Sequence, residues 1–298
     1  MKDYIYLYGQ IISTESFLLY GDFPEADGYG EIKERYHLVG GETGTAAVIL
    51  SSLDCPIKLG GTHIGNINRK IIRDYFSDKN ADITELRDED FEGVKDYVII
   101  DSATRTAFGE WQKHYSRKKP YYEPPCEESI KNAVCCGIDP YFYPDISAKI
   151  CVKWGKPYVT IDCGYDSAIH KGCAVNVVSH QYLREKYRNI DFKELFRLYT
   201  DNTDGLVIFT QGEKEVIYGR RGQPPRYFKP YNLDVVSTLG AGDSFKAGTI
   251  YALYNKMTDD DTVKYASAIA GVACTKFPIA KKPPVLSEIR SLIESERR

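Results

Sequence analysis

The stretch from Ser237 to Phe245 combines two glycines with one carboxylate in a pattern that could do chemistry. It reads Ser-Thr-Leu-Gly-Ala-Gly-Asp-Ser-Phe. Glycine permits backbone angles that other residues resist, and the apolar residues from Phe245 onward recur at helical spacing. We therefore expect Gly240 to Asp243 to form the first turn of a helix. The unpaired N–H groups of such a turn, with the positive end of the helix dipole, make an anion site that suits a phosphate.

Asp243 is the residue that does not fit a plain anion site. A carboxylate repels a phosphate unless a metal ion screens its charge or the carboxylate is needed as a base. We take the base as the working hypothesis. In the alternative interpretation, Asp243 only caps the helix and the glycines only make a tight turn, and the motif by itself favours neither.

The composition indicates one large globular domain with a small-molecule partner. The chain has 298 residues, of which 43% are hydrophobic, and a net charge of −3. It therefore has no overall positive field for nucleic acid or an anionic membrane, and no apolar run reaches the ~20 residues that span a bilayer. The eight cysteines contain no Cys-x-x-Cys pair, which argues against a zinc site or a disulfide framework. We expect a cytoplasmic protein with free thiols.

Alternating strand and helix patterns predict a parallel sheet that positions the motif. A central first strand is expected over Tyr4–Ile12, followed by Ser13, Thr14 and Glu15 at its end. A second glycine turn, Gly40–Thr45, opens a buried helix, and the segment Asp22–Tyr36 has the short alternations of an exposed flap. Further expected elements are a buried strand at 98–100, exposed strand residues 104–108, a surface connection at 118–125, and strands at 133–138, 158–162, 174–178 and 205–209.

Thr210 and Gly212 follow the strand expected at 205–209. Ligands bind at the carboxyl edge of the strands in open α/β sheets, so this pair is expected to lie on a binding edge. The chain after Gly240 is expected to be helical over 243–255, from 260 to about 276, and again after Pro284.

These stretches together resemble the ribokinase-like (PfkB) family of carbohydrate and nucleoside kinases. Ser237–Phe245 matches the family's C-terminal signature except at Ser237, where the family has Asp. Gly40–Ala47 is similar to the family's N-terminal Gly-Gly element, with Thr45 where Asn is usual. Thr210-Gln211-Gly212 looks like its Thr-x-Gly nucleotide element. The three motifs occur in the family's order and span most of the chain.

The resemblance implies a fold, a reaction and a cofactor. The fold is a three-layer α/β/α sandwich with a mostly parallel central sheet plus a small β-sheet lid, in a single kinase domain over 1–298 with lid strands at about 13–38 and 103–112. The reaction is transfer of the ATP γ-phosphoryl group to a hydroxyl of a sugar or sugar-like acceptor, with Mg²⁺ accompanying ATP. Asp243 is the expected base, and the N–H groups of Gly240, Ala241, Gly242 and Asp243 form the expected anion hole.

The resemblance also assigns binding residues. The nucleotide is expected at Thr210, Gly212, Thr238, Gly240 and Gly242, and the acceptor at Thr14, Glu15, Gly40, Gly41, Thr45 and Arg105. Three departures accompany these matches: Ser237 weakens an expected potassium site, Thr14 stands where the family has Asp, and Asn176–Gln181 lacks the Glu of the family's Asn-x-x-Glu element. Metal ligands stay unassigned, and a homodimer through the lid is a further expectation. The alternatives are a nucleoside kinase and a catalytically weak ligand-binding member of the fold.

Overall fold

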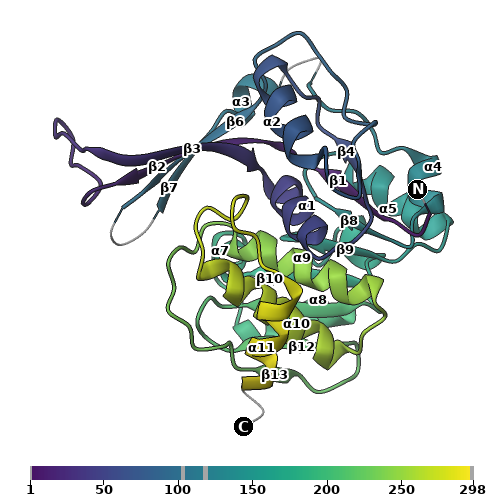
Figure 1. The fold of residues 1–298 in the computed structure, drawn as a ribbon. Coiled ribbons are helices and arrows are strands. Elements are labelled where there is room, and N and C mark those ends of the chain that lie inside the picture. The colour runs from purple at the N-terminus through teal and green to yellow at the C-terminus, as the bar shows by residue number, and fades with distance from the viewer. Residues whose placement is uncertain (1, 102–104, 117–119, 296–298) are drawn as a thin grey trace.

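Parallel strands form the centre of the protein in the computed structural model, which describes residues 2–101, 105–116 and 120–295 (Figure 1). The main sheet has the order β13-β12-β11-β10-β9-β8-β1-β4-β5 and is parallel from β5 to β11, with β12 and β13 antiparallel at one edge. The mostly parallel sheet predicted from the sequence is thus confirmed. Its strands are β1 (Ile5–Gly9), β4 (Ile57–Gly61), β5 (Ala81–Asp82), β8 (Cys135–Ile138), β9 (Tyr158–Ile161), β10 (Val175–Ser179), β11 (Leu206–Thr210), β12 (Val216–Gly219) and β13 (Arg226–Phe228).

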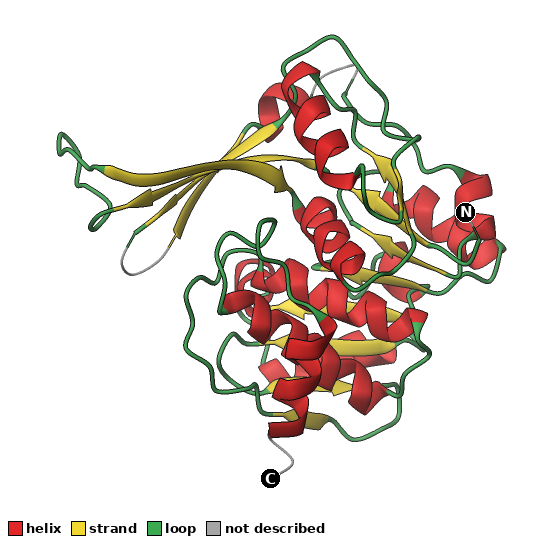
Figure 2. Cartoon of the chain, viewed as in Figure 1, coloured by secondary structure: helices red, strands yellow, loops and turns green. Residues whose placement is uncertain are grey.

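Helices cover both faces of this sheet, as Figure 2 shows. The alternation of β1 explains why, because Ile5 and Leu7 face one helical layer while Tyr4, Tyr6 and Tyr8 face the other. One layer contains α1 (Glu42–Ser52), α2 (Asn66–Phe76), α9 (Ala241–Tyr254), α10 (Asp259–Cys274) and α11 (Leu286–Ser295). The other contains α3 (Trp111–His114), α4 (Glu127–Asn132), α5 (Pro144–Lys153), α6 (Ala168–Lys171), α7 (His180–Lys186) and α8 (Phe192–Asp201).

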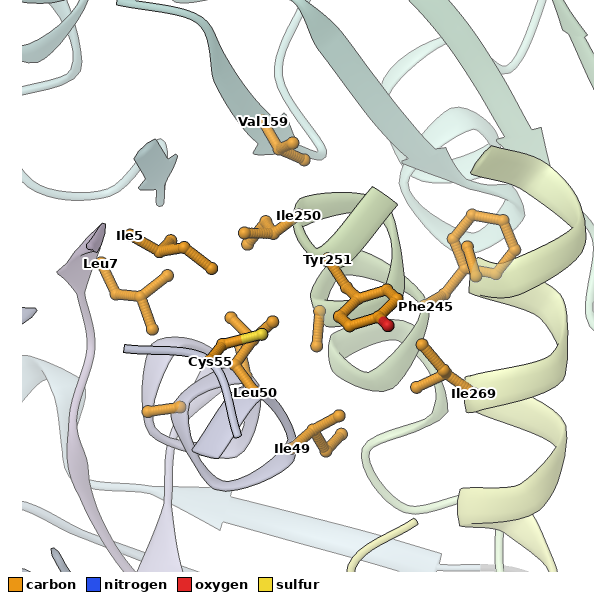
Figure 3. Packing of buried hydrophobic residues seen from close by; sticks show 14 of the residues in the cluster. Ile5, Leu7, Ile49, Leu50, Cys55, Val159, Phe245, Ile250, Tyr251 and Ile269 are labelled. Carbon is orange, nitrogen blue, oxygen red and sulfur yellow. The ribbon is translucent and has the colours of Figure 1, made fainter. Parts of the chain in front are cut away.

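Helix α9 is anchored in the core directly after the glycine turn. Phe245, Ile250 and Tyr251 of α9 pack with residues of β1, α1 and α10 in one apolar cluster (Figure 3). Gly248 makes this packing possible, because a Cβ at that position would come within 2.6 Å of the Ala266 backbone in α10. Burial of this helix fixes the direction in which its first turn points.

A second sheet, which we call the lid sheet, has the order β3-β2-β6-β7. It extends away from the main sheet in Figure 1. Its strands are β2 (Ile12–Leu19), β3 (Ile32–Gly40), β6 (Lys95–Ile100) and β7 (Arg105–Gly109). Most of them fall in the segments expected for a lid, although positions 103 and 104 of that expectation lie outside the described residues. Whether this sheet closes over a ligand stays a prediction.

Two expectations about strands were wrong. The strand expected over Tyr4–Ile12 ends at Gly9, and β2 begins at Ile12 in the other sheet, so Thr14 and Glu15 lie within a lid strand. The buried strand expected at 98–100 belongs to β6, which pairs with β2 and β7 rather than with the main sheet. A short apolar run indicates a buried strand without indicating its sheet. Of the expected surface connection at 118–125, residues 118 and 119 lie outside the described part.

Candidate active site

A pocket of about 220 Å³ lies beside the carboxyl ends of the central strands. Strand order reverses at β1, whose neighbours are β4 on one side and β8 on the other, and such a switch point opens a crevice between the connections. The pocket is bounded by one face of the lid sheet, the first turns of α1 and α9, and residues 277–280.

The first turn of α9 leaves its N–H groups open. Gly240 caps the helix with φ of 74°, the left-handed conformation that favours glycine. The N–H of Ala241 donates to the carbonyl of Thr238 at 3.2 Å, whereas those of Gly240, Gly242 and Asp243 bond to no described residue. A Cβ at Gly242 would meet no atom within 4 Å. The turn therefore has three N–H groups without a described partner, and only Gly240 of its two glycines uses a positive φ.

The glycine turn before α1 is built differently. The N–H groups of Thr43 and Gly44 both donate to the Gln10 carbonyl at 3.1 Å. A Cβ at Gly41, whose φ is 81°, would lie 2.6 Å from the same carbonyl oxygen, and one at Gly40 would overlap the Thr14 hydroxyl. These glycines allow the lid strands, the β1–β2 junction and α1 to approach closely, so this helix start is already satisfied by protein.

Asp243 has an environment that suits a base. Its carboxyl group lines the pocket, and burial is the main cause that raises its pKa, to about 7. The positive charges of Lys246 and Arg105 act in the opposite direction, and the negative charges of Asp139 and Asp162 add to the rise. A carboxylate with a pKa near neutrality can both hold and release a proton at the pH of a cell.

Behind Asp243 lies a buried ion pair that the sequence interpretation missed. Lys246, one helical turn later, contacts Asp139 Oδ1 through its Nζ, and both side chains are at most 1% exposed. Asp139 Oδ2 also accepts hydrogen bonds from the Gln10 N–H at 3.0 Å and the Thr43 hydroxyl at 2.6 Å. The position of Asp139 directly after a buried strand, at the binding edge, was the signal that could have indicated it.

Glu42, in the first turn of α1, is a second unpredicted carboxylate. Its Oε1 accepts a hydrogen bond from the Tyr141 hydroxyl at 2.9 Å, while its Oε2 is buried and bonds to no described residue. Burial, followed by the charges of Asp139 and Asp243, raises the pKa of Glu42 well above its usual value. The group lines the same pocket as Asp243.

The structure brings together four of the six residues expected to bind the acceptor. Thr14, Gly40, Gly41 and Thr45 line the pocket. Glu15 does not, because neighbouring residues of a strand point to opposite faces and its carboxylate pairs with Arg35 away from the pocket.

Arg105 lies on β7, outside the pocket lining, and its Nη1 contacts the Thr238 hydroxyl. This contact links the lid sheet to the segment that precedes α9.

The residues expected to bind only the nucleotide lie outside the pocket. Thr210 ends β11 at the carboxyl edge, in register with Ser179, and Gly212 follows with φ of 65° and open space around its Cα. Asn176 is buried inside β10, where its amide bonds to His170 at 2.9 Å, so it is not available at the edge. The Ser237 hydroxyl accepts the Leu239 N–H at 3.2 Å.

Two classes of feature are absent from the described residues. Within 2–101, 105–116 and 120–295, no three His, Cys, Asp or Glu side chains are placed to hold a metal ion. In the same part of the chain, every helix is too short or too polar to cross a membrane.

Comparison with known proteins finds similarity to carbohydrate kinases in part of the sequence. Residues 194–282 match the model of the pfkB family carbohydrate kinases. A 5-dehydro-2-deoxygluconokinase of Halalkalibacterium halodurans is 30% identical over 107 residues, which are 36% of this chain and 32% of that protein. The chain thus aligns with about a third of the length of the curated relatives it matches.

Similar solved structures extend over the whole chain. A putative ribokinase from Agrobacterium tumefaciens superposes with a TM-score of 0.86 at 17% identity, covering 100% of this chain and 99% of that one. The ribokinase of Arabidopsis thaliana, solved with ribose and ATP, superposes with a TM-score of 0.81 at 16% identity over 99% of both chains. The expected α/β sandwich with an added small sheet is confirmed.

Proposed function

On the premise that the chain is a ribokinase-like member of the PfkB family, we propose that it transfers the γ-phosphoryl group of ATP to a hydroxyl of a sugar-like acceptor. One observation carries the proposal: the open first turn of α9 places unpaired N–H groups and the Asp243 carboxylate beside one pocket. Phosphoryl transfer requires positioning and charge stabilisation more than covalent chemistry, and a helix start offers both.

In this proposal, Asp243 accepts the proton of the acceptor hydroxyl as that oxygen bonds to phosphorus. The N–H groups of Gly240, Gly242 and Asp243 stabilise the negative charge on the transferring group. The N–H of Ala241 contributes less than expected from the sequence, because it is already bonded to Thr238. Lys246 positions Asp139, which in turn holds the start of α1 and the β1–β2 junction through Thr43 and Gln10.

ATP supplies the phosphoryl group, and its phosphates fit the open space at Gly242. We propose that the nucleotide extends from the first turn of α9 along the sheet edge towards Thr210 and Gly212, with Thr238 beside it. Because no described cluster of side chains is placed to hold a metal ion, Mg²⁺ is proposed to be bound mainly by ATP and water, as this ion often is.

A sugar-like acceptor suits the pocket better than a nucleoside does. A nucleobase needs flat stacking surfaces, whereas the only aromatic residue among the described pocket lining is Phe277. The polar lining of Thr14, Ser16 and Thr45 suits hydroxyl groups. Relatives are named for ribose and for a gluconate derivative, so similarity alone does not select the class of acceptor.

A phosphorylation screen tests the proposal. ATP is incubated with sugars, sugar acids, amino sugars, polyols and nucleosides, and ADP formation and the phosphorylated product are measured. Turnover of a sugar-like acceptor is expected, and Asp243→Asn should lower it by about 10²–10⁴ while ATP binding persists, since that is the usual contribution of a general base. Turnover of nucleosides alone, or none at all, would contradict the proposal, and near-normal turnover in the variant would remove Asp243 from its role.

A cytoplasmic location and a homodimer through the lid sheet remain proposals. The second is supported by Ile32 and Phe108, which are 53% and 51% exposed on the two edge strands of that sheet. Light scattering of the wild-type chain and of the double variant Ile32→Ser/Phe108→Ser would test it, and an unchanged mass would contradict it.

A further inference from the structure

The acceptor pocket is lined by acidic side chains and, among the described residues, by no basic ones. Three carboxylate side chains line it, those of Glu42, Asp96 and Asp243, and its described lining includes no Lys, Arg or His. Asp243 has a role in the proposed reaction, whereas Glu42 and Asp96 do not. Their presence calls for a ligand group that complements them.

Asp96 lies near the start of β6, one of the two inner strands of the lid sheet, on the face that lines the pocket. In β6 it pairs with Thr14 of β2 on one side and with Gly109 of β7 on the other. Its carboxylate has no hydrogen bond or ion pair with any described residue. Burial, with a smaller contribution from Glu110, raises its pKa to about 6. The lid sheet therefore directs an uncompensated acidic group into the pocket.

Glu42 lines the same pocket from the body of the protein, in the first turn of α1. Its buried Oε2 has no described partner, and only Tyr141 bonds to its other oxygen. The neighbouring cations are already engaged or lie elsewhere: Lys246 pairs with Asp139, and Arg105 contacts Thr238. Lys95 lies next to Asp96 in β6, so its side chain points to the opposite face, where Glu92 is 3.8 Å away.

Partly buried carboxylates with few partners are costly in their charged form, and a cationic ligand group would offset that cost. A metal ion is the less suitable cation, because the described carboxylates are not placed as a set of metal ligands. A protonated amine has several N–H donors and needs no fixed coordination geometry. The hydroxyls of a neutral sugar can donate hydrogen bonds to these groups but cannot offset their charge once they ionise, and the carboxylate of an acidic sugar would add a further negative charge.

We propose that the acceptor is a sugar or polyol that carries a protonated amine, which binds between Glu42 and Asp96, and that acceptors with a carboxylate are excluded. This inference rests on the proposed kinase function and specifies its substrate class. The reacting hydroxyl still faces Asp243, so the amine serves recognition and takes no part in the transfer.

Matched acceptors test the inference. Each of the glucose, galactose and mannose skeletons is tested at pH 6.5 in three forms: the neutral sugar, the 2-amino sugar and the uronate. Initial rates are measured with ATP, and acceptor binding is measured by calorimetry without ATP. At least one amino sugar is expected to have a kcat/KM roughly 10- to 100-fold above its neutral counterpart, the usual value of a charge-assisted hydrogen bond, and the uronates should be inactive. Binding of the amine should also release protons, because a bound cation lowers the pKa of nearby carboxyls.

Two variants and a control assign the effect to the proposed groups. Asp96→Asn and Glu42→Gln should each lower the preference for the amino sugar over the neutral sugar about tenfold and reduce proton release. Glu34→Gln removes a carboxylate from an exposed position of β3 in the same lid sheet and should change neither.

Equal or better use of a neutral sugar or a uronate would overturn the inference and leave the kinase proposal standing. If nothing is phosphorylated, the kinase proposal fails, and the binding measurements decide the inference separately. The inference is then wrong if every amino sugar binds no more tightly than its neutral counterpart.

Discussion

The buried pair of Lys246 and Asp139 allows a prediction in which stability and catalysis move differently. Lys246→Met leaves the Asp139 charge buried without its partner, and Asp139→Asn leaves Lys246 in the same situation. Breaking a buried ion pair from one side costs about 3–5 kcal/mol. The double variant Lys246→Met/Asp139→Asn contains neither charge. We therefore expect its loss of stability to be smaller than the sum of the single losses by about 2–3 kcal/mol.

Urea unfolding followed by circular dichroism measures this coupling. Asn at position 139 retains an acceptor for the Gln10 N–H or the Thr43 hydroxyl, so the double variant should lose chiefly the ion pair. Thermal unfolding provides a second measurement, with a decrease of roughly 2–4 °C in Tm expected per kcal/mol in a protein of about this size. If the two single losses simply add, the side chains do not interact as described.

The same variants should shift the pH dependence of the rate in opposite directions. Lys246 opposes the rise in the pKa of Asp243, and Asp139 adds to it. Without the lysine, the pKa of Asp243 rises, so the acidic limb of the kcat/KM profile should move to higher pH. Without the Asp139 charge, it should move to lower pH. Arg105 and Asp162, which also act on Asp243, are unchanged in every variant. An unmoved limb would refute the electrostatic part of the reasoning.

Three further predictions concern the first turn of α9 and the segment before it. In the wild type, kcat/KM should fall as the pH drops below about 7, because Asp243 must be deprotonated to act as a base and its pKa is raised to about 7. A flat profile of kcat/KM down to pH 5 would contradict this expectation. Gly242→Val should weaken ATP binding in calorimetry, because the added side chain would block the approach of a phosphate. The Tm should change little, because a Cβ at position 242 meets no atom within 4 Å. An unchanged affinity for ATP would mean that the turn is purely structural. Turnover should be similar in potassium and in tetramethylammonium at equal ionic strength, because the Ser237 hydroxyl is neutral and already bonded to the Leu239 N–H. The variant Ser237→Asp should introduce a dependence of turnover on potassium. A steep, saturable response of the wild type to potassium would show that other oxygens complete a cation site.

Local motifs allowed the sequence to predict the helix start at α9 and the kind of sheet that positions it. The turn at Gly240–Asp243 and the helix that follows are determined by neighbouring residues, and the alternation of strands and helices indicates a parallel sheet. The predicted mostly parallel sheet was confirmed for this reason. The two glycine turns looked alike in the sequence, however, and only the structure shows that the Gln10 carbonyl satisfies one of them.

Contacts between distant residues explain what the sequence did not predict. Asp139 and Lys246 are 107 positions apart, so nothing near either residue shows that they form a pair. Thr14 and Glu15 were both expected to bind the acceptor, because the sequence shows that a strand alternates but not which face meets the pocket. The buried strand expected near Val98 is present, but its short apolar run could not show that it belongs to the lid sheet rather than to the main sheet.

The way the lid sheet joins the body has a consequence for making chimaeras between relatives. Only two residues separate the end of β1 from the start of β2, and β3 runs through Gly40 and Gly41 directly into α1. Thr14 and Gly40 approach so closely that any larger residue at position 40 would collide with the threonine. These two strands must therefore be exchanged as one cassette, with both junctions included, if the acceptor preference of a relative is to be transplanted.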